Sequence, residues 1–276
     1  MVEISVLMSV YKSEKPAYFS RSLQSIWDDQ ILKPDEIILI EDGPLGEELV
    51  NIVDSWKLKL GEKLHLIINE QNLGLTKSLN KGLTLAKGKY IARMDSDDIS
   101  IPERFKLQYE FMESHPEITV VGGCLQEFND DNDCLGIRHY PISNEKVRKY
   151  IYKASPLAHP TVMIRREVFD AGIRYNEQYR TSQDLALWFD ILISGRKIAN
   201  LDNITIKFRR DNDVFKRRSK EKAKNEFKIY ISGIRRLFGL FNLYYFFPLS
   251  RYLFRLMPIS VIRFIYGSNL RTKLLQ

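Results

Sequence analysis

The chain has 276 residues, of which 44% are hydrophobic and 28% charged. This composition excludes a disordered protein and suffices for one large α/β domain or two small ones. The net charge of +7 is unevenly distributed, because residues 206–276 hold 17 of the 42 basic and 4 of the 35 acidic residues. That segment carries +13, which leaves −6 on residues 1–205. A basic tail on a mildly acidic body predicts contact with a polyanionic surface, either anionic lipid or nucleic acid.

The first half of the chain alternates strand and helix patterns. This alternation predicts right-handed crossovers and an open, doubly wound, mostly parallel sheet with helices on both faces. Ligands are then expected beyond the carboxyl ends of the strands. The predicted strands are Ile4–Val10, Glu36–Ile40, Leu64–Ile68 and Tyr90–Met94, and the helical segments between them are Tyr18–Trp27, Gly46–Leu60 and Thr76–Ala86.

The pattern after residue 100 is less regular. Pro102 is suited to the first position of a helix over Glu103–Ser114, and Gln126–Tyr140 reads as polar and turn-rich. From Ser219 onward the chain is helical in character. The remaining predicted elements are strands at Ile118–Gly122, Thr161–Arg165 and Ile204–Phe208 and a helix at Asp184–Ser194.

The sequence argues against a zinc site and against an N-terminal signal peptide. Cys124 and Cys134 are the only cysteines, and no Cys/His group has zinc-binding spacing along the sequence, which argues against a zinc site. We expect two thiols in a reducing cytoplasm, with a disulfide between them as the alternative. Residues 1–16 lack the basic segment and the small-residue cleavage site of a signal peptide.

An acidic turn follows the fourth predicted strand. Asp95, Ser96, Asp97 and Asp98 stand at its carboxyl end, and three neighbouring carboxylates repel one another unless a cation lies among them. Hard oxygen ligands on an open turn suit Mg²⁺ or Mn²⁺ that also contacts substrate phosphates. The alternative is an acidic loop that caps the following helix.

Two further turns follow predicted strands. Asp42, in the Glu-Asp-Gly-Pro turn after the second strand, can accept hydrogen bonds from a base or ribose, or serve only as a turn residue. After the third strand, Asn72 and Gly74 precede a helix with Lys77 in its first turn, where a phosphate can bind. Each turn alone is weak, but their combination at three strand ends predicts a nucleotide site.

These motifs, in this order, resemble the family 2 glycosyltransferases, inverting enzymes with the GT-A fold. The resemblance runs from about Ile4 to Phe208 and is strongest for bacterial enzymes that build surface polysaccharides such as O-antigen, capsule or exopolysaccharide. It implies transfer of a hexosyl or N-acetylhexosaminyl group from a UDP-sugar to a hydroxyl of a glycan or lipid-linked acceptor. The matching motifs are SVLMSVYK at Ser5–Lys12, EDG at Glu41–Gly43, NLG at Asn72–Gly74, GKYIA at Gly88–Ala92, DSDD at Asp95–Asp98 and QD at Gln183–Asp184.

The resemblance also implies roles for single residues. Tyr11 and Asp42 would border the uracil site, and Asp95 would touch the ribose. Asp97 would bind the metal that holds the diphosphate, with Asp95 as a second candidate ligand. Asn72 and Ser96 are included in the expected donor site, as is Lys77, although Lys77 replaces an arginine that many members carry. The family usually has DDGS where this chain has EDGP, which keeps Asp42 but loses a serine hydroxyl.

Asp184 is the candidate general base. An inverting transfer needs a carboxylate within hydrogen-bond reach of the attacking hydroxyl, and the QD motif of the family supplies one. Its alternative is a helix cap, because aspartate is favoured at that position. No Ser/His/Asp or Cys/His constellation for a covalent intermediate is readable from the sequence.

Two basic residues complete the candidate set. His159, before the Thr161–Arg165 strand, is a third candidate metal ligand or a contact for the pyrophosphate or acceptor, with a structural role as the alternative. Arg209, after the last strand, can fold over the diphosphate or simply begin the basic tail. Trp188 can stack on a sugar, but its spacing with Leu185 and Leu192 is typical of core.

The tail, Leu240–Tyr266, mixes aromatic and aliphatic residues with arginines. Its apolar runs are too short to span a bilayer, which needs ~20 apolar residues, and arginines interrupt them. We expect amphipathic helices on an anionic membrane surface, at the inner face of the cell membrane, with a packed helical hairpin as the alternative.

The resulting domain prediction is a GT-A domain over residues 1–210, with a nucleotide half (1–100) and an acceptor half (101–210), and a helical tail over 211–276. Two rival functions remain at this point. A nucleotidyltransferase would need a glycine-rich phosphate loop after the first strand, which is lacking. A nucleic-acid-binding protein would leave the acidic turns unexplained, so no nucleic-acid partner is expected.

Overall fold

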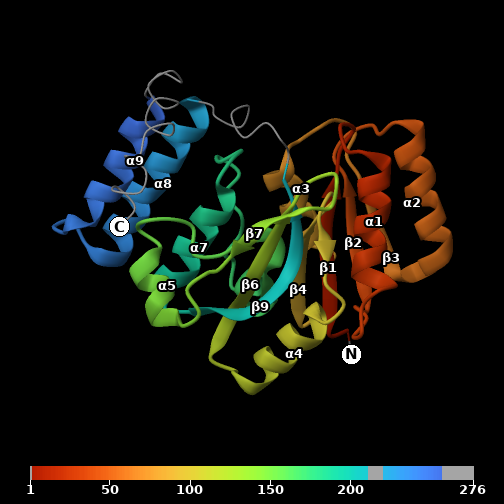
Figure 1. Ribbon diagram of the computed structural model, residues 1–276, viewed down its shortest axis with the longest axis horizontal. Helices are drawn as coiled ribbons and strands as arrows, with labels where there is room; N and C mark the ends of the chain where they lie inside the picture. The colour runs from red at the N-terminus through yellow and green to blue at the C-terminus, as the bar shows by residue number, and fades with distance from the viewer. Residues whose placement is uncertain (1, 211–219, 257–276) are drawn as a thin grey trace. The chain divides into compact units, whose positions relative to one another are not determined.

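The computed structural model describes residues 2–210 and 220–256. The chain divides into two compact units, Met1–Asn212 and Asp213–Gln276, which are described separately below. The first unit is a mixed α/β unit built on one sheet, with strands in the order β3-β2-β1-β4-β8-β6-β9-β5 and β7 paired with β6 (Figure 1).

The first half of this sheet is parallel, as predicted. Its four strands pair in the order β3-β2-β1-β4, and each lies within one residue of its predicted bounds. Because parallel strands end at the same edge, the loops that follow them come together there. These strands are β1 (Ile4–Val10), β2 (Glu36–Glu41), β3 (Leu64–Ile68) and β4 (Tyr90–Asp95).

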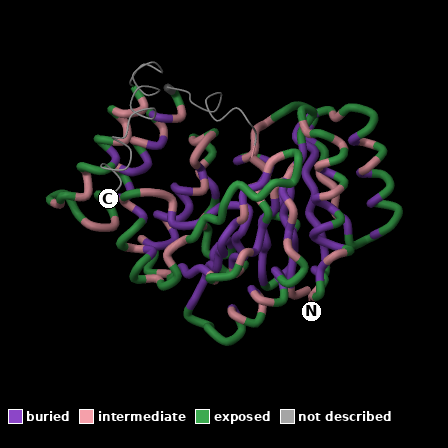
Figure 2. The backbone as a smooth tube through the Cα atoms, viewed as in Figure 1, coloured by how far each residue is buried: buried purple, intermediate pink, exposed green. Residues whose placement is uncertain are grey.

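Helices cover both faces of the parallel half. Alternate strand residues such as Val6 and Met8 share one buried cluster with Phe19 of α1 (Pro16–Trp27) and Leu49 of α2 (Glu47–Leu60). On the opposite face, Gly82 of α3 (Leu75–Leu83) lies directly against Leu7 and Ile40. The strands are therefore buried along most of their length (Figure 2), because each face meets a helix.

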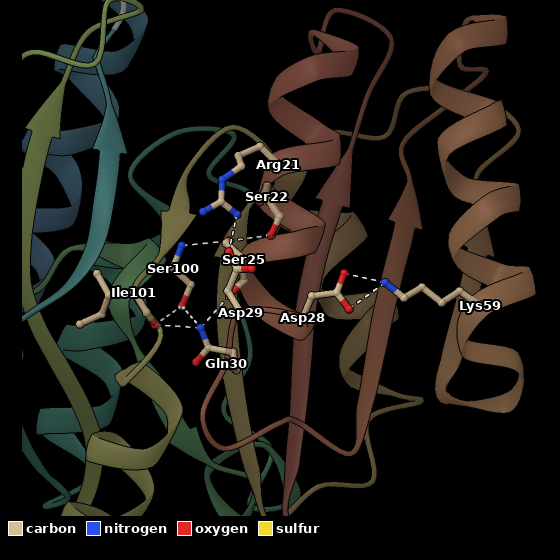
Figure 3. Close-up of polar contacts among 9 residues, drawn as sticks. All are labelled: Arg21, Ser22, Ser25, Asp28, Asp29, Gln30, Lys59, Ser100 and Ile101. Carbon is tan, nitrogen blue, oxygen red and sulfur yellow. Dashed lines mark hydrogen bonds and ion pairs between the residues drawn. The ribbon is translucent and has the colours of Figure 1, made fainter.

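Polar contacts of α1 hold the short strand β5 (Ile99–Ser100) in place, as Figure 3 shows. Ser25 Oγ accepts the backbone N–H of Ser100 at 3.0 Å, and Gln30 Nε2 donates to Ser25 O at 2.7 Å and to Ile101 O at 2.8 Å. On the other side of α1, Lys59 of α2 pairs with Asp28 at 2.6 Å. The acidic turn between β4 and β5 is thus anchored where it meets β5.

The second half of the sheet is mixed. Strand β8 is antiparallel to both β4 and β6, whereas β6 and β9 are parallel, and β5 is antiparallel to β9. The fold-class prediction, a mostly parallel α/β sheet with helices on both faces, is confirmed, with these antiparallel strands added on one side. The elements of this half are α4 (Arg104–Ser114), β6 (Ile118–Phe128), β7 (Cys134–Arg138), α5 (Asn144–Tyr150), β8 (Met163–Arg165), α6 (Glu167–Asp170), α7 (Gln183–Ile193) and β9 (Lys197–Arg209), with short 3-10 turns at Gly61–Lys63 and His159–Thr161.

One segment differs from its prediction. Residues 126–140, predicted as turns, contain the end of β6 and the whole of β7. Every residue of β7 is exposed, and among the described strands β7 pairs only with β6, so it has no buried face that would produce an alternating pattern. Strand β9 also begins before the predicted Ile204–Phe208. Its early residues Ile198–Asn200 are buried, but the exposed Asp202 and Asn203 interrupt the apolar pattern that would have revealed them.

The second unit is described from residue 220 to residue 256. Helices α8 (Lys220–Phe238) and α9 (Phe246–Leu256), joined through a 3-10 turn at Leu243–Tyr245, pack together through the stacked rings of Phe227 and Tyr252, 4.8 Å apart. Glu226 of α8 pairs with Arg251 at 2.9 Å and with Arg255. Across the ranges 2–210 and 220–256, no helix combines the length and apolarity needed to cross a bilayer. The rest of the predicted tail, including Arg263, lies outside the described residues.

Candidate active site

Three carboxylates converge at the carboxyl end of β4. Oxygen atoms of Asp95, Asp97 and Asp98 lie within 4.8 Å of one another, and Asp98 is fully buried. Asp98 Oδ1 accepts a hydrogen bond, but its Oδ2 is buried without a hydrogen-bond partner in the described residues. Three hard oxygen donors with an unsatisfied buried oxygen among them fit a Mg²⁺ or Mn²⁺ ion.

The electrostatics of this turn favour a cation. Burial, with the negative charges of Asp95 and Glu14, raises the pKa of Asp97 to about 7. Burial, with Asp95 and Asp97, raises the pKa of Asp98 well above its usual value. Each shift means that the ionised form is disfavoured, and a divalent cation among the carboxylates would reverse that penalty.

Arg93 is a buried arginine directly beside these carboxylates. It lies in β4 and is buried, and it forms an ion pair with Asp95. Burial opposes its charge, but the charge and hydrogen bond of Asp95, together with Tyr175 and Asp98, more than offset burial, so the pKa of Arg93 is raised. Its Nε and Nη1 atoms are buried without hydrogen-bond partners in the described residues. Unmatched donors of this kind are suited to an anionic ligand.

Arg209 comes to the acidic turn from the end of β9. Its backbone N–H donates to Asp98 Oδ1 at 2.8 Å, and its Nε donates to the carbonyl oxygen of Asp97 at 3.1 Å. The guanidinium lies 3.7 Å from the centroid of the Tyr18 ring and also pairs with Asp130 at 3.2 Å. The residue is therefore fixed beside the carboxylates and does not simply begin a solvated tail.

Ser96 connects the turn to the loop after β1. Its hydroxyl donates to the carboxylate of Glu14, the residue whose charge also raises the pKa of Asp97. On the other side, Ser22 of α1 donates to the carbonyl oxygen of Asp95 at 2.8 Å. A fourth carboxylate, which no sequence motif indicated, thus borders the site.

Asp42 organises the loop between β3 and α3. Its two carboxylate oxygens accept the backbone N–H groups of Leu73 at 2.8 Å and Gly74 at 2.9 Å, and the side chain of Asn72 donates to its carbonyl oxygen at 3.2 Å. Gly43 faces the backbone of Asn72 so closely that a Cβ would lie 2.7 Å from Asn72 N. These contacts position the loop, so any contact of Asp42 with a base would be additional to a structural role.

Tyr11 and Lys77 occupy the same edge of the sheet. Tyr11 directly follows β1 and is 46% exposed, and Lys77 is exposed in the first turn of α3. Both side chains are accessible to a ligand from solvent. Their nucleotide contacts remain predictions.

The loop that leads to Asp184 is held by α3. Asn80 Nδ2 donates to the carbonyl oxygen of Tyr175 at 2.8 Å, and Thr76 Oγ1 donates to that of Tyr179 at 2.7 Å. The loop then enters α7 through Ser182, which has a left-handed backbone with φ of 61° and occupies the N-cap position without a side-chain capping bond. Asp184 follows in the first turn, so it is not the helix cap.

Tyr175 connects Asp184 to the acidic turn electrostatically. Burial raises the pKa of Tyr175, and the charges of Asp184 and Asp95 raise it further while Arg93 opposes them. Such mutual effects operate only among groups that are near one another. The structure therefore brings the candidate base and the carboxylate turn into one neighbourhood, although they are far apart in sequence.

His159 lies in that neighbourhood but outside the carboxylate ligand group. Its Nε2 is 2.8 Å from the Tyr175 hydroxyl, and its ring meets that of Trp188 edge-on at 6.2 Å. Burial, with the charge of Arg93, lowers its pKa well below the usual value, so the ring is neutral. This geometry gives no support to His159 as a metal ligand. Trp188 is fully buried, as its spacing indicated.

Comparison with known proteins decides the family. The profile of "Glycosyl transferase family 2" matches residues 5–172. The amylovoran biosynthesis glycosyltransferase AmsE of Erwinia amylovora is 36% identical over 269 residues, which cover 96% of this chain and 98% of AmsE. The chain belongs to glycosyltransferase family 2. This membership decides against the nucleotidyltransferase that the sequence left open.

Two further proteins to which this family 2 chain is similar come from Escherichia coli and S. aureus. The UDP-Gal:alpha-D-GlcNAc-diphosphoundecaprenol beta-1,3-galactosyltransferase of Escherichia coli is 31% identical over 271 residues, which cover 98% of this chain and 97% of that enzyme. The crystal structure of S. aureus TarS 1-349 in complex with UDP-GlcNAc is similar with a TM-score of 0.68 over 92% of this chain and 72% of that one. At 21% identity, this likeness shows the shared GT-A fold.

Several residues of this candidate site were not predicted from the sequence. One sequence feature could have indicated Arg93, because it is a charged residue inside the apolar strand YIARM, directly before the acidic turn. No sequence feature indicates Glu14 or Tyr175, because each belongs to an irregular loop. Their places depend on the loop after β1 and on the contacts of α3, and neither follows from local sequence.

Proposed function

We propose that the chain transfers a sugar, with inversion, from a UDP-sugar to a hydroxyl of a glycan or lipid-linked oligosaccharide during bacterial polysaccharide synthesis. The observation that carries this proposal is the convergence of Asp95, Asp97 and Asp98 at the carboxyl edge of the sheet in a family 2 chain. The relatives named above support a UDP-sugar donor, since one is a UDP-Gal transferase and TarS was crystallised with UDP-GlcNAc.

The donor would occupy the edge formed by the loops after β1 to β4. Tyr11, Asp42 and Asn72 would border the base, and Asp95 and Ser96 the ribose. Lys77 and Arg209 would meet the diphosphate, joined by the unmatched donors of Arg93. Residues 1–100 would thus form the nucleotide half and residues 101–210 the acceptor half.

Asp97, with Asp95 and the free oxygen of Asp98, would hold Mn²⁺ or Mg²⁺. The ion supplies electrostatic stabilisation of the negative charge that develops on the leaving nucleoside diphosphate. Arg93 holds Asp95 through its ion pair, and Arg209 holds Asp98 and the carbonyl of Asp97, so the ligand oxygens are oriented in advance.

Asp184 would act as the general base. In an inverting transfer the acceptor hydroxyl attacks the anomeric carbon from the face opposite the leaving group and loses its proton to a carboxylate. The loop fastened to α3 through Thr76 and Asn80 orients α7, so that Asp184 lies near Tyr175 and the carboxylate turn. The buried, neutral pair of His159 and Tyr175 lines this neighbourhood without adding charge.

The second unit would attach the enzyme to the cytoplasmic face of the membrane, where a lipid-linked acceptor lies. Phe241 and Leu243, between α8 and α9, are almost fully exposed, at 99% and 89%. Two arginines of the tail, Arg251 and Arg255, both pair with Glu226, so the exposed apolar side chains carry this proposal more than these arginines do.

The test is release of nucleotide from a panel of donors: UDP-Gal, UDP-Glc, their N-acetyl forms, GDP-Man and dTDP-Rha, each with Mn²⁺, Mg²⁺ or EDTA. We expect one UDP-sugar to bind and to turn over slowly with metal, and Asp97→Asn to lose both. Asp184→Asn should bind the donor normally but lose about 10²- to 10⁴-fold in transfer rate.

Asp190→Asn, later in the same helix α7, is the control for changes that merely disturb the helix and should keep the parent rate. Donor binding is followed calorimetrically in the same samples, because a lack of nucleotide release without an acceptor would not show that the donor fails to bind. If no nucleotide sugar binds with either metal, the proposed function is wrong. An Asp184→Asn variant as fast as the parent would remove Asp184 from the role of base.

A further inference from the structure

Three side chains with metal-ligating atoms meet on a different part of the sheet. Cys124 Sγ lies 3.4 Å from His139 Nδ1 and 4.0 Å from Asp202 Oδ1, and His139 Nδ1 lies 3.4 Å from Asp202 Oδ1. Cys124 is buried, whereas His139 and Asp202 are exposed. In the described residues, this cluster and the carboxylate turn are the two groups that could hold a metal ion.

Irregular pairing between β6 and β9 helps to bring these three side chains together. Between the pairs Gly122↔Asn200 and Cys124↔Ile204, β6 advances two residues while β9 advances four, so Asp202 lies in a bulge of β9 next to Cys124. On the other side, β7 pairs with β6 at Leu125↔Arg138, which places His139 directly beyond the end of β7. Bulges re-aim side chains in this manner and are frequent beside functional sites.

The distances agree with coordination of one ion. Zinc in tetrahedral sites has bonds of about 2.3 Å to sulfur and about 2.0–2.1 Å to nitrogen and oxygen, which correspond to ligand separations of about 3.6 Å for S···N and about 3.4 Å for N···O. The observed separations are 3.4 Å for both S···N and N···O. The S···O separation, 4.0 Å, is slightly wide and closes with a rotation of the exposed Asp202 side chain.

The same atoms do not form a nucleophilic triad. In such a triad the histidine uses one ring nitrogen for the nucleophile and the other for the carboxylate. Here a single nitrogen, His139 Nδ1, faces both the sulfur and the carboxylate oxygen. Three atoms that converge on one point suit a cation held between them.

We propose that Cys124, His139 and Asp202 form a metal site for Zn²⁺ or a similar borderline transition metal, separate from the carboxylate turn. A thiolate and an imidazole select such metals over Mg²⁺, which prefers oxygen ligands alone. The side chains of His139 and Asp202 are 66% and 70% exposed, so the fourth coordination position opens to solvent. Burial raises the pKa of the Cys124 thiol, and the backbone of Tyr140 opposes this shift, so metal binding at this site would release the thiol proton.

An ion at this position would join three strands. Its ligands come from β6, from the end of β7 and from the bulge of β9, so binding would fasten the exposed strand β7 and the bulge to the buried strand β6. The expected consequence, apart from any activity, is stabilisation of the full-length protein by the metal.

The test is titration of the full-length protein with Co²⁺, which replaces Zn²⁺ and gives a thiolate-to-metal charge-transfer band in the near ultraviolet. We expect this band in the parent and its loss in Cys124→Ser. His139→Ala and Asp202→Asn change exposed side chains, so these variants should fold, and each should weaken Co²⁺ binding by more than about tenfold. Excess Zn²⁺ should abolish the band in the parent.

Two variants serve as matched controls. Cys134→Ser removes the other thiol, which is exposed on β7, and should leave the band unchanged. Asp97→Asn removes a carboxylate of the β4 turn and should also leave it unchanged. Absence of a thiolate band in the parent, or a band that persists in Cys124→Ser, would overturn the proposal.

Discussion

At the scale of single residues, the raised pKa of Asp97 makes the stability of the metal-free protein depend on pH. The folded state holds this proton with a pKa of about 7, whereas an unperturbed aspartate has a pKa of 3.8. Between about pH 4 and pH 7 the folded state therefore binds more protons than the unfolded state, and stability falls as the pH rises through that window. Above pH 7 the full cost of the ionised, buried carboxylate is present.

We therefore predict that Asp97→Asn stabilises the metal-free protein at pH 8. The neutral amide avoids the repulsion from Asp95 and Glu14. The melting temperature in EDTA should rise by a few degrees, since ~1 kcal/mol corresponds to ~2–4 °C at this chain length, and the gain should shrink towards pH 5. Mn²⁺ should then raise the melting temperature of the parent more than that of the variant.

The parent must be compared with the variant because His159 changes stability with pH in the opposite direction to Asp97. Its pKa is lowered by burial, so its contribution to stability is lost as the pH falls below the usual histidine value of 6.5. The difference between parent and Asp97→Asn cancels that effect. Asp131→Asn, on an exposed loop, is the control and should match the parent at every pH. An equal pH dependence in parent and Asp97→Asn would contradict the assignment.

At the scale of elements, the first half of the sheet could be predicted because its strands are buried on both faces and therefore read as continuous apolar runs. The apolar run of β4 also located the acidic turn, because the turn begins where that run ends. Strand β7 and helix α5 could not be found this way, because β7 is exposed throughout and α5 is short and charged. The places of Arg93 and Tyr175 in the site depend on tertiary contacts that no local period records.

The packing of α3 on the sheet gives a prediction at this scale. A Cβ on Gly82 would lie 2.4 Å from Leu7 Cδ1 and 2.8 Å from Ile40 Cδ1, both in the buried sheet. Alanine normally favours a helix over glycine by ~1 kcal/mol, but here the methyl ends of Leu7 and Ile40 would have to move within the packed core. We expect Gly82→Ala to lower the free energy of unfolding by about 1–3 kcal/mol, measured by urea denaturation.

Gly46→Ala provides the matched control. Gly46 precedes α2 with a φ of −74° and has no atom near its Cβ position, so the same added methyl group meets open space. Its effect should stay below about 1 kcal/mol, the usual size of a cap change. If Gly82→Ala were as stable as the parent, the close contact between α3 and the sheet would not be essential, and the loop that α3 fastens could tolerate a shifted helix.

At the scale of the whole molecule, charge and apolar exposure are concentrated at the carboxyl-terminal end of the sequence. Residues 206–276 carry a net charge of +13, and the second unit exposes Phe241, Leu243 and Phe246. A unit that combines exposed aromatic side chains with a positive charge is suited to an anionic lipid surface, because the apolar groups insert while the charge attracts the headgroups.

We predict that the full-length protein floats with vesicles containing an anionic lipid such as phosphatidylglycerol, less so with neutral vesicles, and less at high salt. The double variant Phe241→Ser/Leu243→Ser should bind such vesicles at least about tenfold more weakly, since burying each of these side chains contributes on the order of 1.5–3 kcal/mol. Leu58→Ser is the matched control, because Leu58 is 89% exposed on α2 of the first unit. Binding of the double variant equal to that of the parent would remove these residues from the membrane contact. Equal binding to neutral and anionic vesicles would leave the basic charge of the tail without a role in attachment.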